Sequence, residues 1–97
     1  MTTFGERIAF LCETAGGSRE DLSALCELSR AYLGMLVRGE RHDMMLTNAV
    51  VVCRVFGCSL EWLATGHGAA PSARALARAV AARREAFPIS PKRRIKA

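Results

Sequence analysis

Apolar residues recur every three or four positions along most of the chain, which is the spacing of one face of an α-helix. Six segments show this spacing, and four of them follow a Thr or Ser that can cap a helix N-terminus. These caps are Thr3, Ser18, Ser29 and Ser59. Helix-stopping residues stand where the segments end: Gly16, Gly17, Gly39, Gly57, Gly66 and Pro88. The only β-branched run, Val50 to Val52, lies within a helical pattern, so the sequence predicts an all-α fold.

The same pattern divides the chain into a five-helix part and an extension. We expect a compact domain over residues 1–66, followed by a linker over residues 67–71. Residues 72–87 are expected to form an amphipathic helix, whose apolar face packs either on the five-helix core or against the same helix of a second subunit. That face contains Ala73, Leu76, Val80 and Phe87. Residues 88–97 are expected to form a disordered basic tail.

The composition is that of one small globular domain. The 97 residues are 51% hydrophobic and 24% charged, so the chain is too apolar to be disordered and too short for a large enzyme. No uncharged run approaches the roughly 20 residues of a membrane span, and the start of the chain lacks the pattern of a secretory signal. We therefore expect a cytoplasmic protein that does not associate with membranes.

The cysteines suggest a disulfide scaffold, a metal site or redox chemistry. They are Cys12, Cys26, Cys53 and Cys58. Disulfides are not expected without a secretory signal, the spacing from Cys53 to Cys58 is unusual for zinc, and the two histidines, His42 and His67, complete no ligand set. No His–acid pair is placed to activate a serine, so we expect no enzyme activity, no metal and no cofactor. The cysteines are expected to pack as small hydrophobic residues.

Charge is distributed unevenly along the chain. Residues 1–68 carry a net charge of −2, whereas residues 69–97 carry +7. Such asymmetry indicates an interaction tail, for which nucleic acid is the commonest polyanionic partner. A tail that only improves solubility is the alternative.

The second and third expected helices are separated by a short turn, as in a helix-turn-helix. Leucines at the right spacing allow the two helices to pack at a steep angle: Leu22, Leu28, Leu33 and Leu36. The helix that follows Ser29 then lies outward, where it can enter a major groove about 12 Å wide.

Several motifs resemble the lambda-repressor-like helix-turn-helix family, the Cro/phage-repressor or XRE type. They are Phe4-Gly5-Glu6-Arg7-Ile8, Gly17-Ser18-Arg19-Glu20-Asp21-Leu22-Ser23, Leu28-Ser29-Arg30-Ala31-Tyr32-Leu33, Arg38-Gly39 and Ser59-Leu60-Glu61-Trp62-Leu63-Ala64-Thr65-Gly66. The resemblance covers roughly residues 4–66 and does not extend to residues 67–97. It implies a five-helix domain of a bacterial or phage transcription regulator, such as a repressor, that binds pseudo-palindromic operator DNA as a homodimer.

The resemblance also implies which residues contact double-stranded DNA. Arg30 stands where the family reads bases, and an arginine can bind guanine O6 and N7 with two hydrogen bonds. The expected base-reading residues are Ser29, Arg30, Ala31, Gly34 and Met35. The expected phosphate-contacting residues in the part that resembles the family are Arg19, Tyr32, Arg38 and Arg41. The charge of the basic tail, and not the resemblance, adds Lys92, Arg93 and Arg94 to the expected phosphate contacts.

Two residues depart from the family pattern, and several acids near the expected DNA-binding face oppose phosphate binding. Glu27 occupies the turn position that is usually glycine, where a left-handed backbone costs a residue with a Cβ free energy. Ser23 replaces a small alanine between the helices, which requires its hydroxyl to find a carbonyl. Acids near the expected DNA-binding face would repel phosphate: Glu20, Asp21, Glu27, Glu40 and Asp43.

Two other functions remain open from the sequence. The first is a protein-interaction module of the same fold, such as an antitoxin or a phage-encoded modulator of a host protein. Its apolar docking surface would contain Gly34, Met35, Met44 and Met45. The second is a catalytic or metal protein that uses the cysteines. Trp62 fits either the core or a dimer surface in each case.

Overall fold

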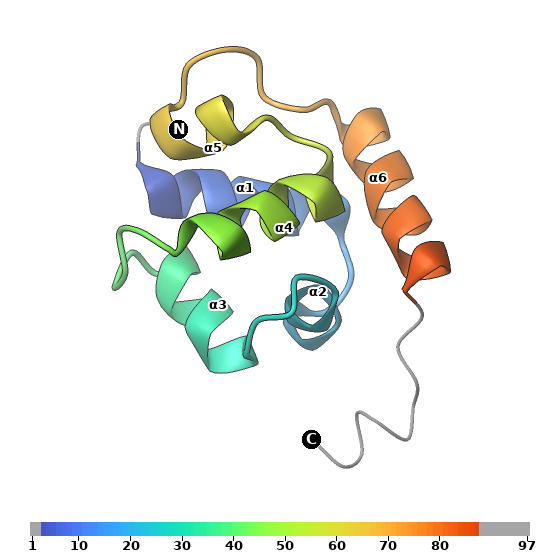
Figure 1. Cartoon of the computed structure of the whole chain (residues 1–97), viewed down its shortest axis with the longest axis horizontal. Helices are drawn as coiled ribbons and strands as arrows, with labels where there is room; N and C mark the ends of the chain where they lie inside the picture. The colour runs from blue at the N-terminus through green and yellow to red at the C-terminus, as the bar shows by residue number, and fades with distance from the viewer. Residues whose placement is uncertain (1–2, 88–97) are drawn as a thin grey trace.

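A computed structural model describes residues 3–87, which form six helices and no strand (Figure 1). The helices are α1 (Phe4–Ala15), α2 (Arg19–Leu25), α3 (Arg30–Val37), α4 (Leu46–Phe56), α5 (Leu60–Thr65) and α6 (Ala73–Ala86). The predicted all-α fold, with five helices and a sixth beyond them, is confirmed. The predicted basic tail, residues 88–97, lies outside the described residues.

Helix capping accounts for where most of the helices begin. The amide of Glu6 donates to Thr3 Oγ1 at 3.1 Å, and the amide of Thr3 donates to Glu6 Oε1 at 2.9 Å, which completes a capping box. Four further helices start after a serine whose hydroxyl accepts from the amide three residues later: Ser18, Ser29, Ser59 and Ser72. The four N-terminal caps predicted from the sequence are therefore confirmed.

The core is shared by all six helices. Helix α1 contacts α3, α5 and α6, while α4 contacts α5 and α6, and α2 packs on α3. The indole of Trp62 is 3% exposed and meets Phe10 edge to face, with ring centroids 6.1 Å apart. Trp62 is thus a core residue and not part of an exposed surface. Among the described residues, no helix has both the length and the apolar composition to cross a membrane.

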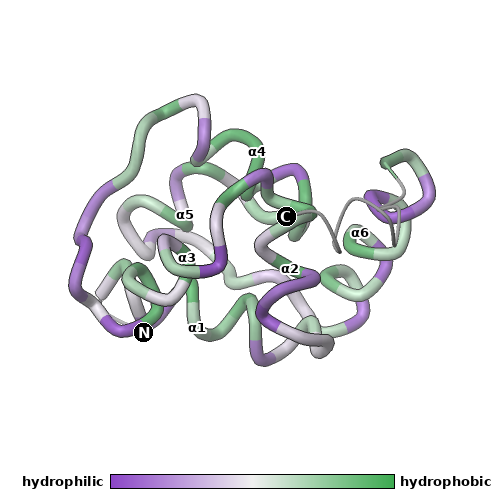
Figure 2. The backbone as a smooth tube through the Cα atoms, turned by 90° about the horizontal axis from the view of Figure 1, so that it is seen from below, coloured by the Kyte–Doolittle hydropathy of each residue, from purple (hydrophilic) through white to green (hydrophobic). Residues whose placement is uncertain are grey.

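Helix α6 packs on the five-helix part, which settles the partner of its apolar face. Leu76 and Val80 are at most 2% exposed, and a Cβ on Gly57 would lie 2.8 Å from the Cβ of Ala79. Hydrophobic and hydrophilic residues alternate along this helix in Figure 2. Phe87 was expected on the same face but is 58% exposed, because the backbone leaves helical geometry at this C-cap residue and the ring packs on Arg83.

The inward face of α4 agrees only in part with the helical spacing, which predicts that Leu46, Ala49, Val50, Cys53 and Phe56 turn inward. Ala49 and Phe56 are buried as predicted, but Leu46 is 67% exposed, and Val52 and Val55 are buried in addition. Apolar residues surround most of α4, so the apolar spacing alone fits more than one inward face, whereas the polar pair Thr47 and Arg54 marks the exposed side.

Arg7 is a buried cation for which the sequence analysis gave no structural role. It is 3% exposed, and it donates from Nε to the backbone oxygen of Leu63 at 2.8 Å and from Nη2 to that of Ala64 at 3.0 Å. These oxygens lie near the C-terminus of α5, where carbonyls lack partners within the helix and a cation is favourable. Its position three residues after Phe4 and four before Leu11, on the apolar face of α1, was the available signal.

Candidate nucleic-acid interface

Helices α2 and α3 form the helix-turn-helix, and Glu27 shapes the turn. Glu27 has φ of 60°, so it adopts the left-handed conformation expected at this position. The amide of Leu28 then donates to the backbone oxygen of Ser23 at 2.9 Å. The chain leaves this turn at Ser29, which caps α3.

Ser23 is accommodated between the two helices. It is 3% exposed, and its hydroxyl donates to the backbone oxygen of Glu20 at 2.9 Å. The hydroxyl therefore has the carbonyl partner that its burial requires.

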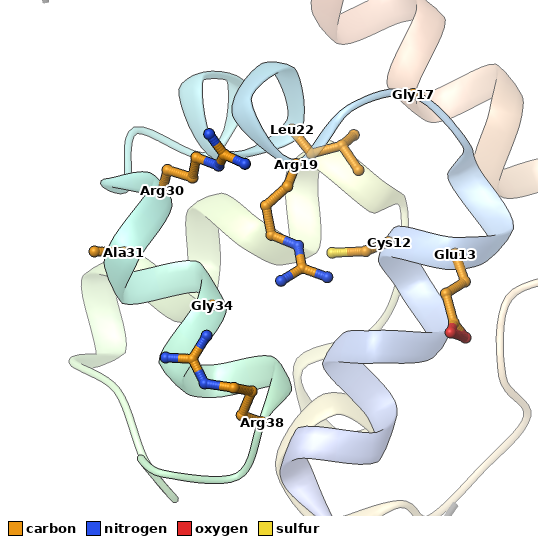
Figure 3. Close-up of a pocket in the computed structure, with 9 residues that line it drawn as sticks. All are labelled: Cys12, Glu13, Gly17, Arg19, Leu22, Arg30, Ala31, Gly34 and Arg38. Carbon is orange, nitrogen blue, oxygen red and sulfur yellow. The ribbon is translucent and has the colours of Figure 1, made fainter.

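One side of α3 faces an open depression of about 780 Å³, which we call the α2–α3 depression. Its lining residues come from α1, α2 and α3 and the residues beside them: Cys12, Glu13, Gly17, Arg19, Leu22, Arg30, Ala31, Gly34 and Arg38. Figure 3 shows Arg19 extending from α2 into this space toward Cys12, with Arg30 and Arg38 near opposite ends of α3. Three of the predicted DNA-contacting arginines are thus brought to one concave surface.

Arg38 lies over Gly34 on this surface. A Cβ on Gly34 would stand 3.0 Å from Arg38 Nη1, so the missing side chain makes room for the guanidinium. Glu40 accepts from Arg38 Nε at 2.6 Å and from Nη2 at 3.3 Å. These hydrogen bonds hold the pKa of the Glu40 carboxyl below its usual range and raise that of Arg38. Glu40 thus occupies the Nε and Nη2 edge of the Arg38 guanidinium, whereas Nη1 lies beside Gly34 of α3.

The opposite side of α3 borders a second open depression of about 740 Å³, the α3–α4 depression. It is lined by residues from the turn, from α3 and from the start of α4: Glu27, Leu28, Ser29, Tyr32, Arg41, Asp43, Met44, Met45 and Asn48. The guanidinium carbon of Arg41 lies 5.7 Å from the centre of the Tyr32 ring, within the range of a cation–π contact.

The structure therefore divides the predicted contact residues between the two sides of α3. Arg19, Arg30, Ala31, Gly34 and Arg38 line the α2–α3 depression, whereas Ser29, Tyr32 and Arg41 line the α3–α4 depression. Met35 lines neither depression and is half-buried. The remaining three predicted contacts, Lys92, Arg93 and Arg94, lie outside the described residues.

Three of the acids expected to repel phosphate are paired with arginines. Glu40 pairs with Arg38, as described above. Glu27 pairs with Arg83 at 3.2 Å, and Asp21 pairs with Arg84, so two of the partners come from α6. The sequence reasoning missed these partners because it assigned the α6 arginines to a general basic extension.

The cysteines do not assemble into a ligand set. All four are free thiols, and within residues 3–87 no group of three or more His, Cys, Asp or Glu side chains is placed to hold a metal ion. Burial raises the pKa of the Cys26 thiol to about 12 and that of Cys58 to about 12. Thiols with raised pKa values are poor nucleophiles at neutral pH, because the thiolate is the reactive form.

A separate apolar groove of about 320 Å³ lies between the N-terminal end of α4 and helix α5. Figure 1 shows that this end of α4 lies away from α6. It is lined by Phe4, His42, Asp43, Met44, Leu46, Ala49, Leu60, Leu63 and Ala64. Leu46 is 67% exposed and Leu60 38%, and the adjacent Met45 is 70% exposed. Exposed apolar side chains gathered around one groove are typical of an interaction surface.

Comparison with known proteins agrees with this geometry. A family model described as helix-turn-helix matches residues 8–63, which include α2, the turn and α3. The chain belongs to the Cro/phage-repressor type of helix-turn-helix family. This is a family of DNA-binding regulators and not of enzymes. No curated protein and no solved structure matches the chain. Helix α6 lies beyond the matched residues.

Proposed function

We propose that this helix-turn-helix protein regulates transcription by reading operator DNA through the major groove as a homodimer. The observation that carries the proposal is the arrangement of Arg19, Arg30 and Arg38 around one exposed side of α3. The major groove of DNA admits an α-helix, and arginines around such a helix supply positive charge for phosphates and hydrogen-bond donors for base edges. Such a regulator would act in the cytoplasm of a bacterial cell, where duplex DNA is accessible.

The proposal gives the arginines different tasks. Arg30 is the first residue of α3 and is exposed, which suits bidentate binding of guanine at the entry of the helix into the groove. Arg19 stands in the first turn of α2, where its guanidinium and the free helix amides favour phosphate. Arg41 belongs with the phosphate contacts on the other side of α3.

The apolar groove supports a homodimer as the binding form. The apolar face of α6 is already buried on α1 and α4, so it offers no dimer surface, whereas two exposed large hydrophobic side chains, Leu46 and Leu60, line the groove. A second copy of the chain seated on this groove would cover them. Two α3 helices related by such a dimer would read half-sites about 34 Å apart.

Selection of binding sequences from random duplex DNA tests the proposal directly, and we expect an enriched inverted repeat. On that sequence, Arg30→Ala should cost about 1–3 kcal/mol of binding free energy and relax the preference at one base pair of each half-site. Arg54→Ala is the matched control, because Arg54 is exposed on α4 and lines neither depression. Equal losses on operator and random duplex would contradict base reading by Arg30.

Salt dependence tests the electrostatic part of the proposal. Log affinity should fall linearly with log salt concentration, by about 0.9 for each phosphate neutralised. Deletion of residues 89–97 should weaken binding to all sequences alike and make the slope shallower, if Lys92, Arg93 and Arg94 contact phosphate. An unchanged slope after the deletion would remove the tail from the interface.

The exposure of Met45 and Leu46 favours one second candidate, a protein-interaction module such as an antitoxin or a modulator of a host protein. The docking surface would then be the apolar groove. Gly34 would not be part of it, because Arg38 covers this residue. A monomeric wild-type chain that shifts no duplex at low salt would favour this candidate over the regulator.

A further inference from the structure

Helix α6 reaches the helix-turn-helix through two arginines of its last turn. Arg83 donates from Nη2 to Glu27 Oε2 at 3.2 Å and from Nε to the backbone oxygen of Leu25 at 3.4 Å. Arg84 pairs with Asp21, in the first turn of α2. The two arginines therefore hold α2 near its start and at its end.

Arg83 is more enclosed than an ordinary surface arginine. Its side chain is 13% exposed, and its guanidinium carbon lies 4.1 Å from the centre of the Phe87 ring. Stacking on an aromatic ring stabilises the guanidinium and fixes its plane. The Leu25 oxygen belongs to the last residue of α2, where a cation also compensates the carbonyls at a helix C-terminus.

Glu27 is the residue for which this contact matters most. Among residues 3–87 it is the only non-glycine residue with a positive φ, a conformation that is unfavourable for residues with a Cβ. The ion pair with Arg83 holds its side chain, and the hydrogen bond to Leu25 fixes the backbone two residues earlier. The turn and the end of α6 therefore stabilise one another.

Both acids also border the surface at which we propose that DNA binds. Glu27 lines the α3–α4 depression. Asp21 Oδ2 would lie 3.7 Å from a Cβ on Gly17, which lines the α2–α3 depression. Residues 1–68 carry a net charge of −2. A carboxylate repels a DNA phosphate that lies within the Debye length, which is about 8 Å at physiological ionic strength. An ion pair at each acid cancels most of this repulsion.

We propose that α6 is part of the DNA-binding unit, in which Arg83 and Arg84 neutralise the carboxylates of Glu27 and Asp21 beside the proposed DNA surface. The inference rests on the proposed function and extends it to a helix outside the residues that match the family. Arg83 and Arg84 are positioning residues, which act through the two acids and do not touch DNA themselves.

Removal and restoration of charge test this inference. Arg83→Gln combined with Arg84→Gln leaves both carboxylates unpaired, and we expect affinity for the selected operator to fall roughly tenfold. Adding Asp21→Asn and Glu27→Gln removes the carboxylates as well, so affinity should return to within about threefold of the wild type. Fluorescence anisotropy with a labelled duplex measures the wild type and these two variants.

Arg74→Gln combined with Arg78→Gln is the matched control. It removes the same formal charge from α6, but both arginines are exposed and neither forms an ion pair in the described part of the chain. The control should bind within about threefold of the wild type, because screening weakens charges that lie far from the duplex. A tenfold loss in the control would show that only total charge matters, which overturns the inference.

The other outcomes separate this inference from the proposed function. Wild-type binding together with a loss that acid removal does not restore overturns the inference and assigns the two arginines to direct DNA contact. A wild-type protein that binds no duplex overturns the proposed function, and this inference with it. If circular dichroism shows that the double Gln variant is unfolded, Arg83→Lys with Arg84→Lys replaces it, and retained affinity is then expected because the charge is kept.

Discussion

At the scale of single residues, the position of Arg38 explains why a glycine, Gly34, stands inside helix α3. Glycine in a helix interior costs about 1 kcal/mol relative to alanine, yet Gly34 stands in the middle of α3. The guanidinium of Arg38 occupies the space that a Cβ would take. Arg38 can lie against the side of α3 only because this space is free.

We therefore expect Gly34→Ala to separate stability from DNA binding. The added Cβ would meet Arg38 Nη1 at 3.0 Å, and the end of a flexible side chain can move away at little cost. The free energy of unfolding should rise by up to about 1 kcal/mol in urea denaturation, while operator affinity or base preference changes because the guanidinium is displaced.

Gly5→Ala provides the contrast for this prediction. Its Cβ would stand 2.9 Å from the backbone oxygen of Leu36, which cannot move without shifting α3. This variant should lose about 1–3 kcal/mol of stability. Equal destabilisation by both alanine substitutions would show that Arg38 is not free to move.

At the scale of helices, the sequence predicted where each helix begins better than it predicted which face of α4 is buried. Ser18, Ser29 and Ser59 cap helices as expected, because capping is a local interaction between residues close in sequence. The inward face of α4 was only partly right, because apolar residues surround most of this helix and the exposed side marked by Thr47 and Arg54 was not used to orient it.

The candidate site shows the same limit of prediction from sequence. The family pattern placed Arg19, Arg30 and Arg38 near α3, and the structure brings them to one depression. The partners of Asp21 and Glu27 lie 63 and 56 residues away along the chain, so no local pattern connected them to α6. Contacts of this kind depend on how the finished helices pack.

The close approach of α4 and α6 gives a prediction at the same scale. Gly57 ends α4 with φ of 68°, and a Cβ there would lie 2.8 Å from that of Ala79. Gly57→Ala should therefore lower the free energy of unfolding by about 2–4 kcal/mol, from left-handed strain and from overpacking combined. Urea denaturation followed by circular dichroism measures the loss.

Two further variants divide that loss into its causes. Gly68→Ala adds a Cβ at φ of 93° with no atom within 4 Å, so it reports the strain of a left-handed residue alone. Ala79→Gly removes the clashing methyl but places a glycine inside α6, which costs about 1 kcal/mol in the wild type. In the Gly57→Ala background this substitution should cost less than it does in the wild type, and an equal cost in both would mean that α6 does not limit the space at Gly57.

At the scale of the whole molecule, the two ends of α4 have different tasks. Its C-terminal end is covered by α6, whose last turn also holds α2 through Arg83 and Arg84. Its N-terminal end borders the apolar groove, where Leu46 and Leu60 are exposed. Helix α4 is thus covered by α6 at its C-terminal end, whereas apolar side chains stay exposed at its N-terminal end.

A charge placed at this groove should dissociate the proposed homodimer. Leu46 is 67% exposed, so Leu46→Glu should leave the monomer folded while it raises the dimer dissociation constant at least about tenfold, because a carboxylate would have to be buried. Sedimentation velocity measures the dimer, and anisotropy should show weaker operator binding in parallel. Thr47→Glu is the matched control, since Thr47 is exposed on the same turn and does not line the groove. A monomeric wild type would contradict the expectation.

The close contact between Gly5 and the backbone of α3 has a consequence for redesign of α3. Gly5 of α1 lies close to the backbone of Leu36 near the end of α3, and Ser29 caps the start of α3. These two contacts set the direction of α3, and neither involves its outward side chains. Arg30 and Ala31 are exposed on α3, so we expect that they can be exchanged without a change in the direction of this helix. Under the proposed function, a library varied at these two positions should yield proteins of new sequence preference on an unchanged framework.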